Sequence, residues 1–335
     1  MERDDWPTKY WSTADSPMQE AYCQKLSELS SVIEKEYGSI SGIVIIRNGI
    51  MIYEAYYRGK GPDDSIHVAS VTKSILSALT GIAVKHGYIS SVKQRVLDFF
   101  PEYEAAVPGG NRALITLENL LTMTAPYSYE DWHEPFEQLC SSPDWIRFIL
   151  DMLGENGDIG TFKYSTAGAH LLSAILTRAT GKSTREFANE MLSAPIGMRQ
   201  IPDYPMNGYG FDDLFGAGLR GWVHDPHGIN TGGWGLTLTP RDMARFGFLY
   251  LSNGYWDGQE IISEAWVRAS SARNRNRYGY MWWQYDARDI PVFAALGDGG
   301  NAVFCIPQRD MVVAVASEFT ENPKDRWMLV RDHIL

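Results

Sequence analysis

The sequence has little cysteine, no long apolar run and a deficit of positive charge. Its three cysteines, Cys23, Cys140 and Cys305, are odd in number and widely spaced, which argues against a disulfide framework. No stretch approaches the roughly 20 apolar residues that span a bilayer, so we expect no membrane anchor. The first residues are charged where a signal peptide has its apolar core, which favours a cytoplasmic protein.

Acidic residues outnumber basic ones by 41 to 30, which gives a formal net charge of −11. This balance argues against nucleic acid and anionic membrane surfaces as partners, because both are negatively charged. We expect a small-molecule substrate instead. His224 and His227 flank an acid, but no further histidine or cysteine cluster completes a zinc set, so neither a metal nor a cofactor is predicted.

Strand patterns occur near both ends of the chain. Residues 43–46 and 51–56 flank Asn48-Gly49, a pair typical of a two-residue hairpin turn. Residues 303–306 and 311–316 predict a second hairpin. The two hairpins together suggest one antiparallel sheet built from both ends of the chain.

The residues between these ends show mainly helical patterns and loops. We therefore expect an α/β (α+β) fold, with a central antiparallel sheet flanked by helices and an inserted helical domain. The predicted boundaries are residues 1–95 and 224–335 for the α/β domain and 96–223 for the mainly α-helical insertion. At 335 residues and 44% hydrophobic content, the chain can bury a large core.

The most informative segment, Ser70-Val71-Thr72-Lys73, opens an apolar helical pattern that ends near Gly87. Residues three positions apart share one helix face, so the Ser70 hydroxyl and the Lys73 amine can meet. A serine hydroxyl needs a base to become a nucleophile, and a helix N-terminus favours negative charge beside it. The pattern therefore indicates a nucleophile paired with its base, although the motif alone is equally compatible with an ordinary helix start.

A second copy of the same spacing serves as an internal control. Ser90-Ser91-Val92-Lys93 lies just past Gly87, in a short polar connection. It is interpreted as a solvated loop.

Two further segments could accompany the serine. Tyr164 precedes a second helical pattern, where a tyrosine can share or relay the serine proton. Residues 296–301 are rich in glycine and could bring a backbone N–H close to a developing oxyanion. Each also has an ordinary explanation, as a half-buried aromatic residue and as a hairpin turn.

These segments resemble the serine β-lactamase and penicillin-binding-protein superfamily, and within it the class C-like branch of esterases, D-amino-acid peptidases and nylon-oligomer hydrolases. Residues 230–247 and 278–283 are similar to further signatures of that branch, so the resemblance covers nearly the whole chain. It implies a β-lactamase-like/transpeptidase-like fold with the active site between the two domains.

The resemblance also implies roles for individual residues. Ser70 would be the acylated nucleophile, Lys73 its general base and Tyr164 the second proton-transfer group. The oxyanion hole would use the backbone N–H groups of Ser70 and Asn301, with Gly299 and Gly300 in the strand beside the active site.

Two positions depart from the pattern of the family. Thr166 stands where the second motif usually has asparagine, so contacts to the lysine and substrate differ. Asp298 stands where the third motif has lysine or histidine, which inverts the local charge and disfavours anionic penicillin-like substrates. Both residues, with Gly299 and Gly300, are predicted to contact substrate.

The sequence therefore predicts a serine hydrolase that acts through an acyl-enzyme on small esters or amides. Two alternatives stay open. One is a β-lactamase or a D-amino-acid peptidase or amidase. The other is a catalytically silent penicillin-binding or ligand-binding relative.

Overall fold

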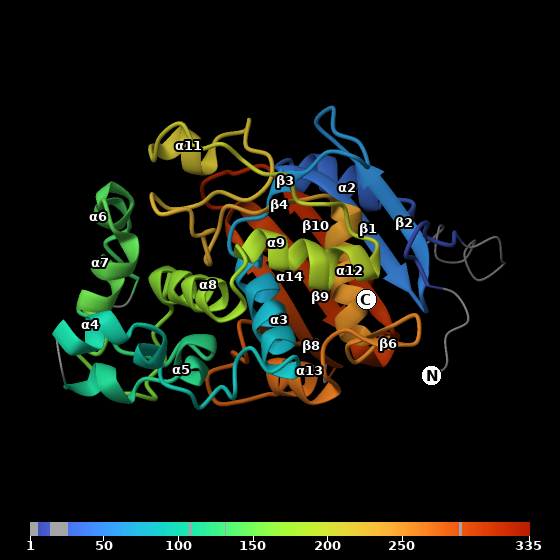
Figure 1. Cartoon of the computed structure of the whole chain (residues 1–335). Helices are drawn as coiled ribbons and strands as arrows, with labels where there is room; N and C mark the ends of the chain where they lie inside the picture. Colours follow the sequence, from blue (N-terminus) through green and yellow to red (C-terminus); the bar gives the residue numbers. More distant parts are fainter. Residues whose placement is uncertain (1–5, 14–25, 107–108, 131, 288–289) are drawn as a thin grey trace.

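The computed structural model describes residues 6–13, 26–106, 109–130, 132–287 and 290–335 (Figure 1). Its centre is a six-stranded antiparallel sheet with the strand order β2-β1-β10-β9-β8-β7. The strands are β1 (Ile40–Arg47), β2 (Ile50–Tyr56), β7 (Trp283–Ala287), β8 (Ile290–Gly297), β9 (Asn301–Ile306) and β10 (Met311–Ser317). β1 pairs with β10, so the two ends of the chain meet in the middle of the sheet.

Both predicted hairpins are confirmed. Asn48 and Gly49 connect β1 to β2 with positive φ angles of 52° and 79°, as a turn of this kind requires. β7 and β8 were not predicted as strands. They form one side of the sheet, and the end of β8 lies near Ser70, the predicted nucleophile.

The sheet is covered on both faces. Along β1, Val44 and Ile46 join the apolar cluster that contains α3 (Val71–Lys85) and α12 (Pro240–Leu251). Ile43 and Ile45 join the cluster that contains α2 (Leu29–Glu36) and α14 (Arg326–Leu329). This alternation follows from the two-residue repeat of a strand. It explains why β1 reads as a continuous apolar run rather than as alternating polar and apolar residues.

The helices vary from one turn to four. They are α2 (Leu29–Glu36), α3 (Val71–Lys85), α4 (Pro101–Ala106), α5 (Leu117–Leu121), α6 (Phe136–Ser141), α7 (Trp145–Met152), α8 (Thr166–Thr180), α9 (Thr184–Ala188), α10 (Ala194–Ile196), α11 (Phe211–Phe215), α12 (Pro240–Leu251), α13 (Glu264–Ser271) and α14 (Arg326–Leu329). Two small ladders pair β3 (Ile66–His67) with β4 (Thr237–Leu238) and β5 (Tyr255–Trp256) with β6 (Gln259–Glu260).

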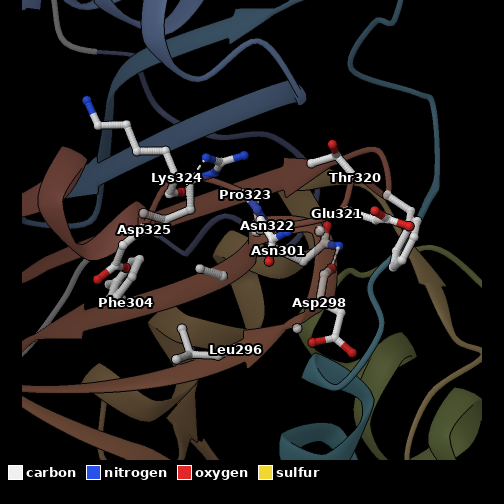
Figure 2. A pocket seen from close by; sticks show the side chains of 16 residues that line it. Leu296, Asp298, Asn301, Phe304, Thr320, Glu321, Asn322, Pro323, Lys324 and Asp325 are labelled. Atoms are coloured by element: carbon white, nitrogen blue, oxygen red, sulfur yellow. Dashed lines mark hydrogen bonds between the residues drawn. The ribbon is translucent and has the colours of Figure 1, made fainter.

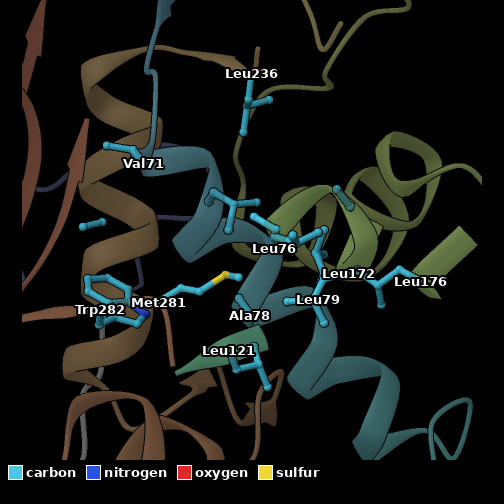
Figure 3. Packing of buried hydrophobic residues seen from close by; sticks show 14 of the residues in the cluster. Val71, Leu76, Ala78, Leu79, Leu121, Leu172, Leu176, Leu236, Met281 and Trp282 are labelled. Carbon is cyan, nitrogen blue, oxygen red and sulfur yellow. The ribbon is translucent and has the colours of Figure 1, made fainter. Parts of the chain in front are cut away.

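The helix predicted after Ser70 is confirmed as α3, which is buried from Val71 to Ala83. Figure 3 shows its apolar side chains packed with Leu172 and Leu176 of α8. Because α3 is enclosed along most of its length, the position of its first turn is firmly fixed.

Helices α4 to α7 gather to one side of the sheet, with α8 between them and α3 (Figure 1). The antiparallel sheet with flanking helices confirms the predicted fold class. The exact domain boundaries at 95/96 and 223/224 stay a prediction.

None of the helices in the described ranges is long and apolar enough to cross a membrane. Cys140 and Cys305 are free thiols, and Cys23 lies outside the described residues.

Candidate active site

Ser70 and Lys73 lie together at the first turn of α3. Lys73 Nζ donates a hydrogen bond to Ser70 Oγ over 3.0 Å, and the lysine side chain is almost fully buried, with 1% of its surface exposed. Ala69, the residue before the serine, has φ of +48°. A non-glycine residue in this region is strained, and such strain is held where the surrounding structure fixes a functional geometry.

Lys73 has two further hydrogen-bond acceptors. Its Nζ donates to Thr166 Oγ1 over 3.2 Å and to the carbonyl oxygen of Gly233 over 2.9 Å. No carboxylate in the described part of the chain pairs with this amine. Lys73 is therefore positioned by neutral groups, one of which is the Thr166 hydroxyl.

Thr166 is held in place through its backbone. Ser165 caps α8 by accepting a hydrogen bond from the N–H of Gly168 over 2.8 Å. The Glu134 carboxylate accepts the N–H groups of Thr166 and Ala167, over 2.9 and 2.6 Å. The sequence analysis missed Glu134, which lies more than 30 residues away in sequence with no local motif to mark it.

Gly233 must be a glycine at this site. A Cβ at this position would collide with the Thr166 side chain and would lie 3.2 Å from Lys73 Nζ. This steric limit explains part of the signature between residues 230 and 247.

Tyr164 contacts Lys73 through its ring rather than its hydroxyl group. Lys73 Nζ lies 4.9 Å from the ring centroid, and the ring stacks against Trp132 and Trp283. Within the described ranges the Tyr164 hydroxyl has no hydrogen-bond partner. The structure thus brings Tyr164 to the pair, and its predicted role in proton transfer stays a prediction.

The strand edge beside Ser70 is formed by Gly297, the last residue of β8. A Cβ there would collide with the Val68 carbonyl and would lie 3.0 Å from the backbone nitrogen of Ser70. The sequence analysis included Gly297 in the glycine-rich segment 296–301 but gave it no role of its own, because it did not recognise β8. Only a glycine lets the strand come this close to the start of α3.

Gly299 and Gly300 are not part of the strand beside the site, so that prediction was wrong. They form a turn after β8, with φ angles of 78° and 92°. Their missing side chains would face Phe319 and Arg326 respectively. Asn301 lies on β9 opposite Gly297, and its side-chain amide donates to the carbonyl oxygen of His67.

Ser70, Thr166 and Asp298 line one cavity of about 610 Å³. Its walls are largely aromatic and comprise Phe136, Tyr209, Phe211, Phe215, Trp234 and Phe319. A second cavity of about 690 Å³ lies across the glycine turn, between Gly299, Gly300, Asn301 and residues 319–326 (Figure 2). It contains neither Ser70 nor Lys73, so the cavity at the serine is the candidate active site.

The charged side chains that line the serine cavity are acidic. They are Glu137 and Asp298. His67 also lines it, but burial lowers the pKa of His67 to about 4, and its Nε2 accepts the N–H of Gly235 over 3.0 Å. His67 is therefore neutral at pH 7.

The second serine-lysine spacing forms no such pair. Ser90 Oγ donates to Gln94 over 2.8 Å, while Lys93 makes an ion pair with Glu118.

Asp225 pairs with buried His170 over 3.1 Å, and its neighbour His224 contacts a backbone carbonyl. Within the described part of the chain, no group of three His, Cys, Asp or Glu side chains could hold a metal ion.

Comparison with known proteins gives consistent results. The beta-lactamase family model matches residues 32–333. The chain is 22% identical to the 6-aminohexanoate-dimer hydrolase of Paenarthrobacter ureafaciens, over 94% of this chain and 81% of the relative.

Two solved structures share the fold. EstCE1, described as a hydrolase with promiscuous acyltransferase activity, superposes with a TM-score of 0.71 at 17% identity, over 95% of this chain and all of the other. The class C beta-lactamase of Rhodobacter sphaeroides superposes with a TM-score of 0.66 at 18% identity, over 93% of this chain and 98% of the other. The chain belongs to the beta-lactamase family of serine hydrolases.

Proposed function

We propose that this enzyme hydrolyses small esters or amides through an acyl-enzyme on Ser70, with Lys73 as the general base. The observation that carries the proposal is the 3.0 Å contact between Lys73 Nζ and Ser70 Oγ at a helix N-terminus that opens into a cavity. A serine needs such a base, and the lysine amine can act as one in its neutral form, whose lone pair accepts the Ser70 proton.

In the acylation step, Ser70 Oγ attacks the substrate carbonyl carbon while its proton passes to Lys73 Nζ. A bond forms between Oγ and carbon, and the carbonyl electron pair moves onto oxygen. The bond from carbon to the leaving oxygen or nitrogen then breaks, and the leaving group takes the proton. Water attacks the acyl-enzyme in the same way, which releases a carboxylic acid and returns the proton to Ser70.

The developing oxyanion needs two N–H donors. We assign one to Ser70 and the other to the end of β8, at Gly297 or Asp298, in place of Asn301. The close approach of Gly297 to Ser70 N supports this assignment. Tyr164 is proposed as the second proton-transfer group, since its ring lies against the amine.

The β-lactamase alternative is less well supported by this site. A penicillin-like substrate carries a carboxylate, and the ionised side chains that line the cavity are Glu137 and Asp298. The similarity to a hydrolase named for an amide dimer keeps amides beside esters as substrates. A catalytically silent binding relative would be acylated once on Ser70 and would not release the acyl group.

Labelling with a fluorophosphonate, followed by peptide mass spectrometry, tests the proposal. We expect the adduct on Ser70 and its loss in Ser70→Ala, while Ser90→Ala, the matched control, labels normally. Turnover of p-nitrophenyl acetate, nitrocefin and D-alanine p-nitroanilide then separates the alternatives. Labelling at Ser90, or full turnover by Ser70→Ala, would exclude the assignment, and labelling without any turnover would indicate the silent relative.

A further inference from the structure

We propose that the cavity at Ser70 selects esters or amides that carry an alkylammonium group, which Asp298 and the aromatic walls hold beside the reacting carbonyl. This inference rests on the proposed function and names its substrate class. It is drawn from the chemistry of the cavity walls and from the placement of one carboxylate.

Several aromatic side chains line the same cavity and pack against one another. Phe215 has ring-centroid distances of 5.3 Å to Phe211, 5.8 Å to Phe136 and 6.2 Å to Trp234. Phe319 lies 6.4 Å from Phe211 and is 63% exposed, so it stands at the open side of the cluster. Aromatic faces attract cations through their quadrupoles, and ammonium groups are the ligands of such aromatic cages.

The charge inside the cavity has the matching sign. Its lining contains two carboxylates, while His67 is neutral and Lys73 lies buried below the surface. An anionic substrate group would meet both carboxylates. A cationic group would meet these carboxylates, and none of the residues that line the cavity is a lysine or an arginine.

Basic residues lie near Asp298 in the two neighbouring cavities. Lys324 and Arg326 line the second cavity with it, and both have partners: Lys324 pairs with Glu36, and Arg326 donates to Ser39 Oγ and Ser317 Oγ. Lys60 and Arg220 line a smaller cavity of about 260 Å³ that shares Asp298 with the first. Lys60 Nζ lies 3.7 Å from Glu318, and Arg220 donates to the carbonyl oxygens of Ala217 and Leu219. Both cations already have partners, so they leave the Asp298 carboxylate free to bind a ligand.

Asp298 is placed to act on substrate. It follows Gly297, the residue in closest approach to Ser70 N, and its side chain is exposed. In the described part of the chain, only its backbone oxygen accepts a hydrogen bond, from Asn301 Nδ2 over 3.0 Å. Asp298 lines the cavity at Ser70, the second cavity and the smaller cavity, so it lies where the three adjoin (Figure 2).

The test uses three p-nitrophenyl esters whose acyl chains are identical except at the end, which is trimethylammonium, tert-butyl or carboxylate. The first two groups have the same shape, so their ratio of kcat/KM isolates the charge. We expect the ammonium ester to exceed the tert-butyl ester by about tenfold, the scale of one good cation–π and carboxylate contact. The carboxylate ester should be the slowest.

Asp298→Asn should reduce the tenfold preference to about threefold or less. The readout is the ratio of kcat/KM for the ammonium ester to that for the tert-butyl ester, so a loss of activity common to both esters cancels. Glu321→Gln is the matched control, because Glu321 lines the second cavity and not the cavity at Ser70. It should keep the full preference. A ratio near one in the parent enzyme, or an unchanged ratio in Asp298→Asn, would overturn the inference.

A measurement without any variant gives an independent check. Choline and its neutral isostere 3,3-dimethylbutan-1-ol should compete with the tert-butyl ester, and choline should inhibit about tenfold more strongly. Equal inhibition would contradict the inference. If none of the three esters is turned over and Ser70 is not labelled, the proposed function itself fails and the inference fails with it.

Discussion

Gly297 lies so close to Ser70 that a Cβ at position 297 would be 3.0 Å from the backbone nitrogen of the serine. The backbone of Gly297 is extended, with φ of −139°, so the need for glycine is steric and not conformational. Gly297→Ala should push the end of β8 away from α3 and separate the two oxyanion donors. We expect kcat to fall by about 10² or more, because losing one such donor costs that much.

The control for this variant is Gly61→Ala, where the added Cβ would make an ordinary contact of 3.8 Å with Asp64. Burst kinetics with a p-nitrophenyl ester, together with the thermal midpoint, separate the two effects. Gly297→Ala with a normal acylation rate would show that the end of β8 supplies no donor.

Lys73→Arg tests the base. Arginine keeps the positive charge but cannot release its proton, so it cannot accept the proton of Ser70. We expect the acylation rate to fall by about 10² to 10⁴, the range of general-base catalysis. Lys93→Arg, in the second serine-lysine spacing, is the matched control and should leave the rate unchanged. Parental turnover by Lys73→Arg between pH 6 and 9 would place the base elsewhere.

The sequence predicted the sheet of both chain ends, α3 and the Ser70-Lys73 pair, because each depends on short-range periodicity. It failed where spatial neighbours decide the outcome. β8 was missed because Pro291 and two alanines weaken its strand pattern, and the glycines after it were then placed in the wrong element. Glu134 could not be found, and Gly297 could not be singled out within its glycine-rich segment, since their partners lie far away in sequence.

Tyr164→Phe separates the two features of this residue. The variant keeps the ring that faces Lys73 at 4.9 Å and removes only the hydroxyl. If Tyr164 transfers a proton, kcat should fall by about 10² with little change in stability. Single-turnover acylation and deacylation rates would locate the affected step. Activity within twofold of the parent would mean that Tyr164 acts only by packing against the amine.

His67 should make stability depend on pH. Burial lowers its folded-state pKa from 6.5 to about 4, so between these values the unfolded chain binds a proton that the folded chain does not. The folded state therefore loses no stability from His67 above pH 6.5, and it becomes less stable relative to the unfolded chain as the pH falls below this value. From pH 7 to pH 5 we expect a loss of about 2 kcal/mol in the free energy of unfolding.

His67→Gln tests this origin, because glutamine can accept the Gly235 N–H but cannot titrate. Urea unfolding of both proteins at pH 7 and pH 5 gives the comparison. The glutamine variant should lose about 2 kcal/mol less over this range than the parent. Identical pH dependence in the two proteins would show that other groups are responsible.

The hydroxyl oxygen of Thr166 lies 3.2 Å from Lys73 Nζ. Thr166→Val keeps the shape of the side chain and removes this acceptor, which leaves Ser70 Oγ and the Gly233 carbonyl for the amine. An ordinary hydrogen bond contributes about 0.5 to 1.5 kcal/mol, so losing the one that orients the amine should lower kcat by up to about tenfold, with KM little changed.

Folding should survive the valine substitution, since Glu134 holds this residue through the backbone N–H and not through the side chain. Thr166→Ser, which keeps the hydroxyl and loses the methyl group, should stay within about threefold of the parent, because the acceptor to Lys73 remains. Steady-state kinetics with one ester, together with thermal midpoints, decide between the two parts of the side chain. If Thr166→Ser is as slow as Thr166→Val, the methyl group that packs on Gly233 positions the Lys73 amine, and the hydroxyl group does not.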